Sequence, residues 1–129
     1  MQMPMTADDI LVSIFYHIKK QKKQKLTANR EILHNAFYNA RIKYPKVMSL
    51  FSFREREVFP ESNQLDQALS NLDATGLISR QNLTPRYYFL EKSLDSSYKK
   101  YSKKILLEAG IKEADICKVA LNISKNISK

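Results

Sequence analysis

The sequence has little of what several classes of protein require. Only one of its 129 residues, Cys117, is a cysteine, so no internal disulfide can form, and no basic stretch after Met1 leads into a long apolar core. Two glycines and four prolines are too few for the turns of an all-β chain of this length. The longest apolar runs fall far short of the ~20 residues of a membrane-spanning helix. We therefore expect a mainly helical, cytoplasmic protein without membrane association.

Motifs for catalysis and cofactor binding are also missing. There is no nucleophile elbow, glycine-rich phosphate loop, HExxH pair or double CxxC motif. His17, His34 and Cys117 lie at none of the spacings typical of metal ligands, and Cys117 fits a small core residue beside an apolar helix face. Asp8-Asp9 fits a helix start. We expect a non-enzymatic protein with no catalytic residues, no cofactor and no metal.

Positive charge is abundant but unevenly distributed. The formal net charge is +9, yet residues 59–92 carry three basic and four acidic side chains. Five of the 22 basic residues fall within one stretch of seven, which we expect to be a basic helix end or loop: Lys19, Lys20, Lys22, Lys23 and Lys25. A balance this basic favours polyanionic partners, although such a run can also be merely a solvated surface.

Three helices are predicted in the first 75 residues. Thr6 followed by two aspartates predicts the start of a helix that runs to about Lys20. Thr27 can cap a second helix that ends near Ile42, and apolar residues at 47, 48, 50 and 51 suggest a short amphipathic turn under the domain. Ser62 and Gly76 bound a third helix over Leu65–Thr75, because serine caps helix starts and glycine terminates helices.

A hairpin and two more helices are predicted after Gly76. The segments 77–80 and 86–90 flank the turn 81–85 and read as strands. Leu94, Tyr98, Tyr101 and Ile105 then recur at helical intervals up to Gly110, and apolar residues at 116, 119, 120, 123 and 127 form one face of a last helix. We expect both helices either to dock on the domain or to pair with a second subunit.

The third helix and the first strand carry the pattern Ser62-x-x-Leu65-x-x-Ala68-Leu69-x-x-Leu72-x-x-x-Gly76-Leu77-Ile78. With two helices before this pattern and a hairpin after it, roughly residues 8–90 resemble the winged helix-turn-helix superfamily. Phe51-x-Phe53 followed by Pro60-x-Ser62-x-x-Leu65 is also similar to phage-associated, antitoxin-like winged-helix proteins. The resemblance implies a mainly α (α+β) fold. It consists of a winged-helix domain over residues 6–92 with a two-stranded wing, and a C-terminal helical extension over residues 93–129.

The same resemblance implies a DNA-binding regulator of transcription that contacts double-stranded DNA. The polar side of the third helix would meet base edges through Asn63, Gln64, Gln67, Ser70 and Asn71. Arg80 and Arg86 would flank the wing and contact phosphates or the minor groove, with the lysine cluster adding sequence-independent attraction. A homodimer through residues 94–127 would suit such a regulator.

Two features favour an alternative, a protein–protein interaction module of antitoxin-like or accessory type. Residues 43–61 separate the second and third helices, where a helix-turn-helix has a turn of about three or four residues. The third helix and its start carry Glu61, Asp66 and Asp73 but no lysine or arginine, and phosphates repel carboxylates. The sequence therefore leaves both hypotheses open.

Overall fold

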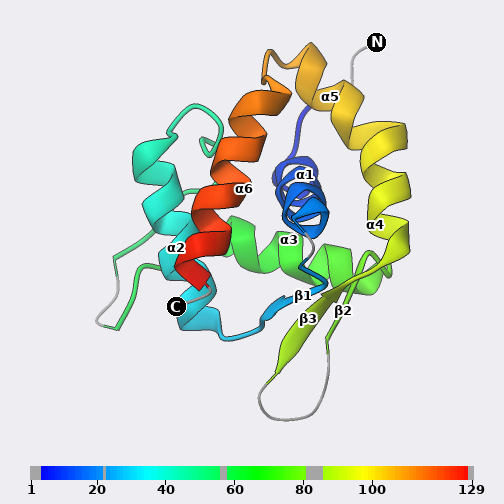
Figure 1. Ribbon diagram of the computed structural model, residues 1–129. Coiled ribbons are helices and arrows are strands. Elements are labelled where there is room, and N and C mark those ends of the chain that lie inside the picture. Colours follow the sequence, from blue (N-terminus) through cyan, green and yellow to red (C-terminus); the bar gives the residue numbers. More distant parts are fainter. Residues whose placement is uncertain (1–3, 22, 56–57, 81–85, 128–129) are drawn as a thin grey trace.

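A long central helix organises the fold. The computed structural model describes residues 4–21, 23–55, 58–80 and 86–127, and within them the chain is mainly helical with a small antiparallel sheet. Helix α1 (Ala7–Lys20) lies in the middle of the molecule, with α3, α4 and α6 around it (Figure 1). All residues from Ile10 to Ile18 are buried, as expected for a helix covered on every side.

The predicted start of α1 is confirmed, whereas the predicted start of the second helix is wrong. Thr6 and Asp9 form a reciprocal capping box. Helix α2 (Arg30–Lys43) is capped by Asn29, whose side chain accepts from the Ile32 N–H at 3.0 Å. Thr27 is instead the last residue of strand β1 (Lys25–Thr27), because pairing with another strand keeps the chain extended up to that point.

The segment between α2 and α3 is anchored by apolar side chains. Residues 45–50 form turns, and Val47, Met48 and Phe51 are buried, which confirms the predicted apolar turn under the domain. Further on, Arg54 and Glu61 exchange two backbone hydrogen bonds in an isolated antiparallel bridge. The bridge brings the chain back to the start of α3.

Helix α3 (Asn63–Ala74) lies between Ser62 and Gly76 as predicted, although it begins two residues earlier and ends one residue earlier than expected. The Ser62 hydroxyl accepts from the Leu65 N–H at 3.2 Å. Gly76 has φ 78°, the left-handed conformation that ends a helix at low cost only for glycine. The residues that α3 buries are the predicted face, Leu65, Ala68, Leu69 and Leu72.

The predicted hairpin is confirmed as β2 (Ile78–Arg80) and β3 (Tyr87–Leu90), while its turn, 81–85, lies outside the described residues. The sheet is nevertheless not two-stranded. Strand β1 pairs with the other edge of β3 and gives the order β1-β3-β2, because its backbone supplies the hydrogen-bonding partners that this edge needs. Leu26 lies opposite Tyr88, and both are buried.

The helical stretch after β3 contains a π-helical turn. It comprises α4 (Lys92–Ser97), η1 (Tyr98–Ser102) and α5 (Lys103–Glu108). Its buried residues recur every four positions, at 94, 98, 102 and 106. A wider π turn keeps residues four apart on one face. The prediction that Tyr101 points inward is therefore wrong: its side chain is 61% exposed.

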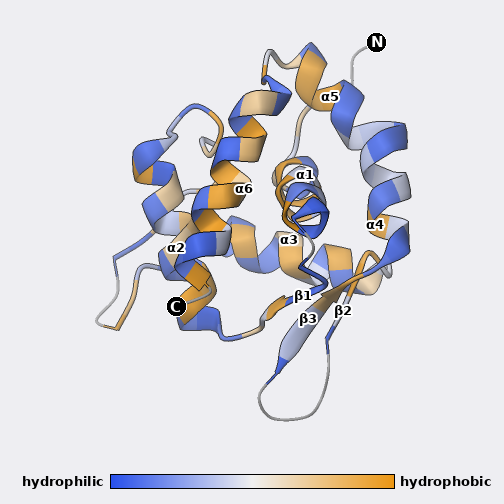
Figure 2. Cartoon of the chain, viewed as in Figure 1, coloured by the Kyte–Doolittle hydropathy of each residue, from blue (hydrophilic) through white to orange (hydrophobic). Residues whose placement is uncertain are grey.

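Helix α6 (Glu113–Ile127) packs against α1 and α2 of the same chain. Figure 2 shows apolar residues alternating with polar ones along it, as in an amphipathic helix. Of the predicted inward positions, 116, 119, 120 and 123 are buried and 127 is partly buried. Cys117 is exposed, so its prediction as a core residue is wrong, since it lies one position beyond that face. A single apolar core contains residues from both sides of position 92, so the C-terminal helices dock on the domain.

Candidate nucleic-acid interface

One arginine pairs with two carboxylates at the start of α3. The Arg30 guanidinium donates to Glu61 Oε1 at 2.6 Å and to both Asp66 oxygens at 3.1 and 2.6 Å. Partial burial alone would raise the pKa of Asp66, but hydrogen bonds from Arg30 and His34 outweigh burial and hold that pKa below its ordinary value. Two of the three carboxylates that argue against DNA binding thus share one cation from α2, which offsets one of their two charges, and Asp73 is left exposed.

A buried histidine fastens this cluster to the helix start. His34 is fully buried, and its Nδ1 accepts the Ser62 N–H at 3.0 Å. The other nitrogen, Nε2, must then carry the proton that it donates to Asp66 at 2.9 Å. Burial lowers the pKa of His34, so the ring is neutral near pH 7. Helix α2 is therefore joined to the start of α3 by directional bonds.

Two of the predicted base-reading residues are occupied by contacts within the chain. Gln64 Oε1 accepts from the Ser52 N–H at 3.2 Å and from the Ser52 hydroxyl at 3.0 Å. Asn71 Nδ2 donates to both carboxylate oxygens of Asp8, at 3.3 and 3.0 Å. Both side chains are only partly exposed. They hold α3 against its neighbours rather than facing solvent.

The other predicted positions on α3 form an exposed, uncharged strip. Asn63, Gln67 and Ser70 are all exposed. Asn63 Oδ1 accepts from Arg54 at 3.2 Å and Gln67 Nε2 donates to Asn71 at 3.0 Å, and both are surface contacts that a ligand could replace. This strip is the part of α3 that can reach a partner.

The two hairpin arginines are exposed at the ends of the strands. Arg80 lies opposite Tyr88. Burial raises the pKa of Tyr88, and the nearby Arg80, which hydrogen-bonds to it, opposes that rise. The Arg86 carbonyl accepts from the Ala28 N–H at 3.0 Å, which ties the base of the hairpin to the residue after β1. Both arginines therefore project from a backbone that the sheet holds in place.

The lysine cluster divides into structural and exposed members. Lys19 is only 14% exposed and pairs with Asp95 at 3.0 Å, which fastens α4 to α1. Lys23 Nζ donates to a carbonyl of α6 at 3.5 Å. Lys20 and Lys25 are exposed, the latter 4.4 Å above the ring of Tyr87. The fifth member, Lys22, lies outside the described residues.

A histidine–cysteine contact was not anticipated from the sequence. Cys117 Sγ lies 3.4 Å from His17 Nδ1, and Tyr98 Oη and Glu113 Oε1 lie 3.3 and 3.8 Å from Nε2 of the same ring. Burial lowers the pKa of His17 and raises that of Cys117, so the pair is neutral and the thiol is not activated. Over the described ranges no group of three or more His, Cys, Asp or Glu side chains could hold a metal ion. No sequence signal joins residues a hundred positions apart.

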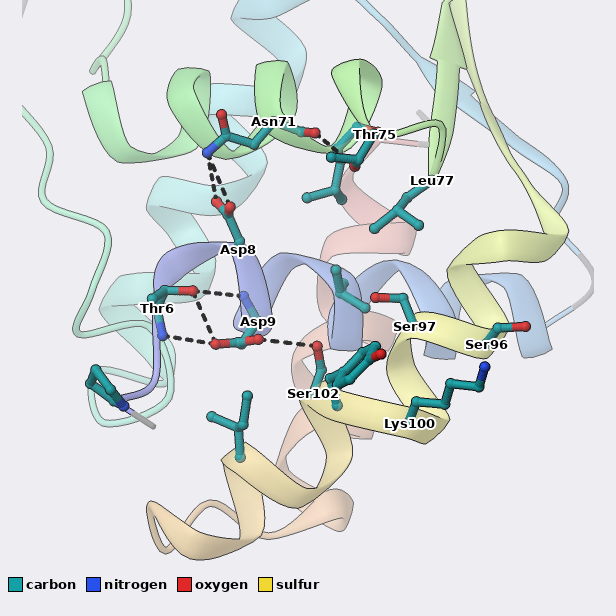
Figure 3. Close-up of a pocket in the computed structure, with 15 residues that line it drawn as sticks. Thr6, Asp8, Asp9, Asn71, Thr75, Leu77, Ser96, Ser97, Lys100 and Ser102 are labelled. Carbon is teal, nitrogen blue, oxygen red and sulfur yellow. Dashed lines mark hydrogen bonds between the residues drawn. The ribbon is translucent and has the colours of Figure 1, made fainter. Parts of the chain in front are cut away.

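A cleft of about 580 Å³ also escaped the sequence reasoning. It opens between the start of α1, the end of α3 and the α4–η1 stretch (Figure 3). Asp8 and Asp9, explained by sequence only as a helix start, line it together with Tyr101. In the sequence, Leu94, Tyr98 and Leu106 also fit a spacing of four, which would have placed Tyr101 on the outside.

Comparisons with protein-family models, with curated proteins and with solved structures find no match to this chain. In the part of the chain that the structure describes, no helix has the length and apolar character needed to cross a membrane.

Proposed function

We propose that the protein is a non-enzymatic DNA-binding regulator of winged-helix type. Arg80 and Arg86 would contact phosphates, the exposed Lys20 and Lys25 would add attraction, and the uncharged strip of α3 would approach the groove. The observation that carries the proposal is the pairing of Arg30 with Glu61 and Asp66. A carboxylate near phosphates is repelled, and this pairing halves the negative charge at the start of α3, from two units to one.

The proposed interface is narrower than the one read from the sequence. It omits Lys19, Gln64 and Asn71, because each makes a contact within the chain that holds neighbouring segments together. Sequence selectivity would depend on Asn63 and Gln67, since amides can pair with base edges, whereas the arginines supply affinity. Affinity should accordingly depend strongly on salt and weakly on sequence.

The test compares two double variants that each lose two positive charges. Arg80→Ala with Arg86→Ala removes two cations at the hairpin, and Lys112→Ala with Lys118→Ala removes two exposed cations near and on α6. Binding to a fluorescent mixed-sequence duplex is measured by anisotropy over a range of salt concentrations. The slope of log affinity against log salt should fall by about 1.8 for the arginine variant, at about 0.9 per phosphate contact, and stay unchanged for the lysine variant.

Equal slopes for the two variants would show that only net charge matters and would remove the hairpin from the interface. Absence of duplex binding at low salt would overturn the DNA function and leave the protein-interaction module as the surviving hypothesis. Pairing of two chains through residues 94–127 stays a separate prediction, which sedimentation at two protein concentrations tests.

A further inference from the structure

The cleft between α1, α3 and η1 has the size and lining of a small-molecule site. Its volume of about 580 Å³ lies within the range of ligand pockets, roughly 300–1,000 Å³. Apolar side chains from four different elements or their flanks form part of its wall: Val12, Leu72, Leu77 and Ile105. A ligand with an apolar body can therefore be covered along its length.

One end of the cleft is acidic. Asp8 is oriented by Asn71, and Asp9 accepts from the Thr6 N–H and hydroxyl at 3.0 Å and from the Ser102 hydroxyl at 3.2 Å. All of these donors are neutral, and no ion pair involves either carboxylate among the described residues. Two oriented carboxylates without a cation beside them suit an ammonium group.

The other end carries a cation and hydroxyl groups. Figure 3 shows Ser96 and Lys100 across the cleft from Asp8 and Asp9, and Ser97 also lines this side. Lys100 belongs to the π-helical turn η1, and π turns inserted into α-helices occur frequently at functional sites. The same turn places Tyr101, 61% exposed, against the cleft. A carboxylate would find the Lys100 ammonium and the Ser97 hydroxyl here.

We propose that this cleft binds a short zwitterionic peptide with apolar side chains, of which a dipeptide is the representative. Its ammonium group would lie between Asp8 and Asp9, its carboxylate would lie by Lys100, and its side chains would cover the apolar wall. The separation of opposite charges across an apolar cleft decides the class, because a simple amine or a simple acid would satisfy only one end. The inference is independent of DNA binding.

The first test uses the unaltered protein and a matched ligand series in isothermal titration calorimetry. The probes are leucyl-leucine, N-acetyl-leucyl-leucine, which lacks the ammonium group, and leucyl-leucinamide, which lacks the carboxylate. Leucyl-leucine should bind, and each blocked analogue should bind at least about tenfold more weakly, since each loses a charge-assisted contact. No heat from leucyl-leucine at millimolar concentration, or equal affinity for all three probes, would overturn the proposal.

The second test removes the charged side chains of the cleft one at a time. Asp8→Asn should weaken leucyl-leucine binding about tenfold and leave the affinity for the acetylated probe unchanged, while Lys100→Met should weaken leucyl-leucine and spare leucyl-leucinamide. Asp73→Asn and Lys104→Met remove the same charges from exposed positions outside the cleft and should bind like the unaltered protein. Circular dichroism checks that each variant is folded. Equal effects of cleft and control variants would contradict the proposed site.

Discussion

Replacement of His34 by leucine tests the link between α2 and α3. His34 is fully buried and accepts the buried Ser62 N–H while donating to Asp66. Leucine fills a similar volume but can neither accept nor donate a hydrogen bond. The change therefore removes the two hydrogen bonds of His34 and keeps the volume that its side chain fills.

The expected loss follows from the two bonds. A buried N–H left without an acceptor costs about 1–3 kcal/mol, and a hydrogen bond to a charged group contributes about 1.5–3 kcal/mol. Asp66 is 38% exposed and keeps Arg30, so its share lies at the low end of that range. We expect His34→Leu to lower the free energy of unfolding by about 2–4 kcal/mol.

Urea denaturation followed by circular dichroism at neutral pH measures this loss. The control is His34→Asn, whose side-chain carbonyl can occupy the position of Nδ1 and accept the Ser62 N–H. The asparagine variant should recover about half of the stability that leucine loses. A leucine variant within about 0.5 kcal/mol of the unaltered protein, or an asparagine variant no better than leucine, would refute the assigned bonds.

The same residue predicts a pH dependence. Burial lowers the pKa of His34 below 6.5 in the folded protein, so the unfolded chain takes up a proton first as the pH falls. The stabilising contribution is present above pH 6.5 and is lost as the pH falls from there towards the folded-state pKa. His17, whose pKa is also lowered, acts in the same direction. His34→Leu should flatten the decline in unfolding free energy between about pH 7 and 5 without abolishing it.

Three smaller effects follow from local geometry. Ser62→Ala removes the cap that accepts the Leu65 N–H and should cost about 1 kcal/mol in urea denaturation, and no loss would contradict the cap. The Cβ of Gly76→Ala meets no atom within 4 Å, but the residue must keep φ at 78°. We therefore expect backbone strain alone to lower the free energy of unfolding by about 1 kcal/mol, and Gly76→Asn to lower it less. Lys19→Met breaks the pair with the partly exposed Asp95 and should cost less than about 1 kcal/mol, with the difference shrinking at high salt.

The elements with strong local signals were predictable from the sequence. The capping box at Thr6, the Ser62 cap and the glycine after α3 act within a few residues, so their effect is visible in the sequence itself. The apolar faces of α3 and α6 are set by periodicity and were predicted for the same reason. The mainly helical fold with a small sheet follows from these elements.

Features that depend on contacts between distant segments were decided only by the tertiary structure. Thr27 and Asn29 are both competent caps, and pairing of β1 with β3 selected Asn29. The π turn leaves Tyr101 exposed and buries Ser102, whose hydroxyl donates to Asp9 of α1. Such choices have nearly equal local free energies, so packing partners far along the chain determine them.

The candidate surfaces divide in the same way. The sequence alone determined a basic chain with arginines on a hairpin and a polar, acidic third helix. Only the tertiary structure paired Arg30 with Glu61 and Asp66, 31 and 36 positions away, and opened a cleft with opposite charges at its two ends. Charge counts are additive along a sequence, whereas the field at a surface depends on which charges lie within a few ångströms of one another.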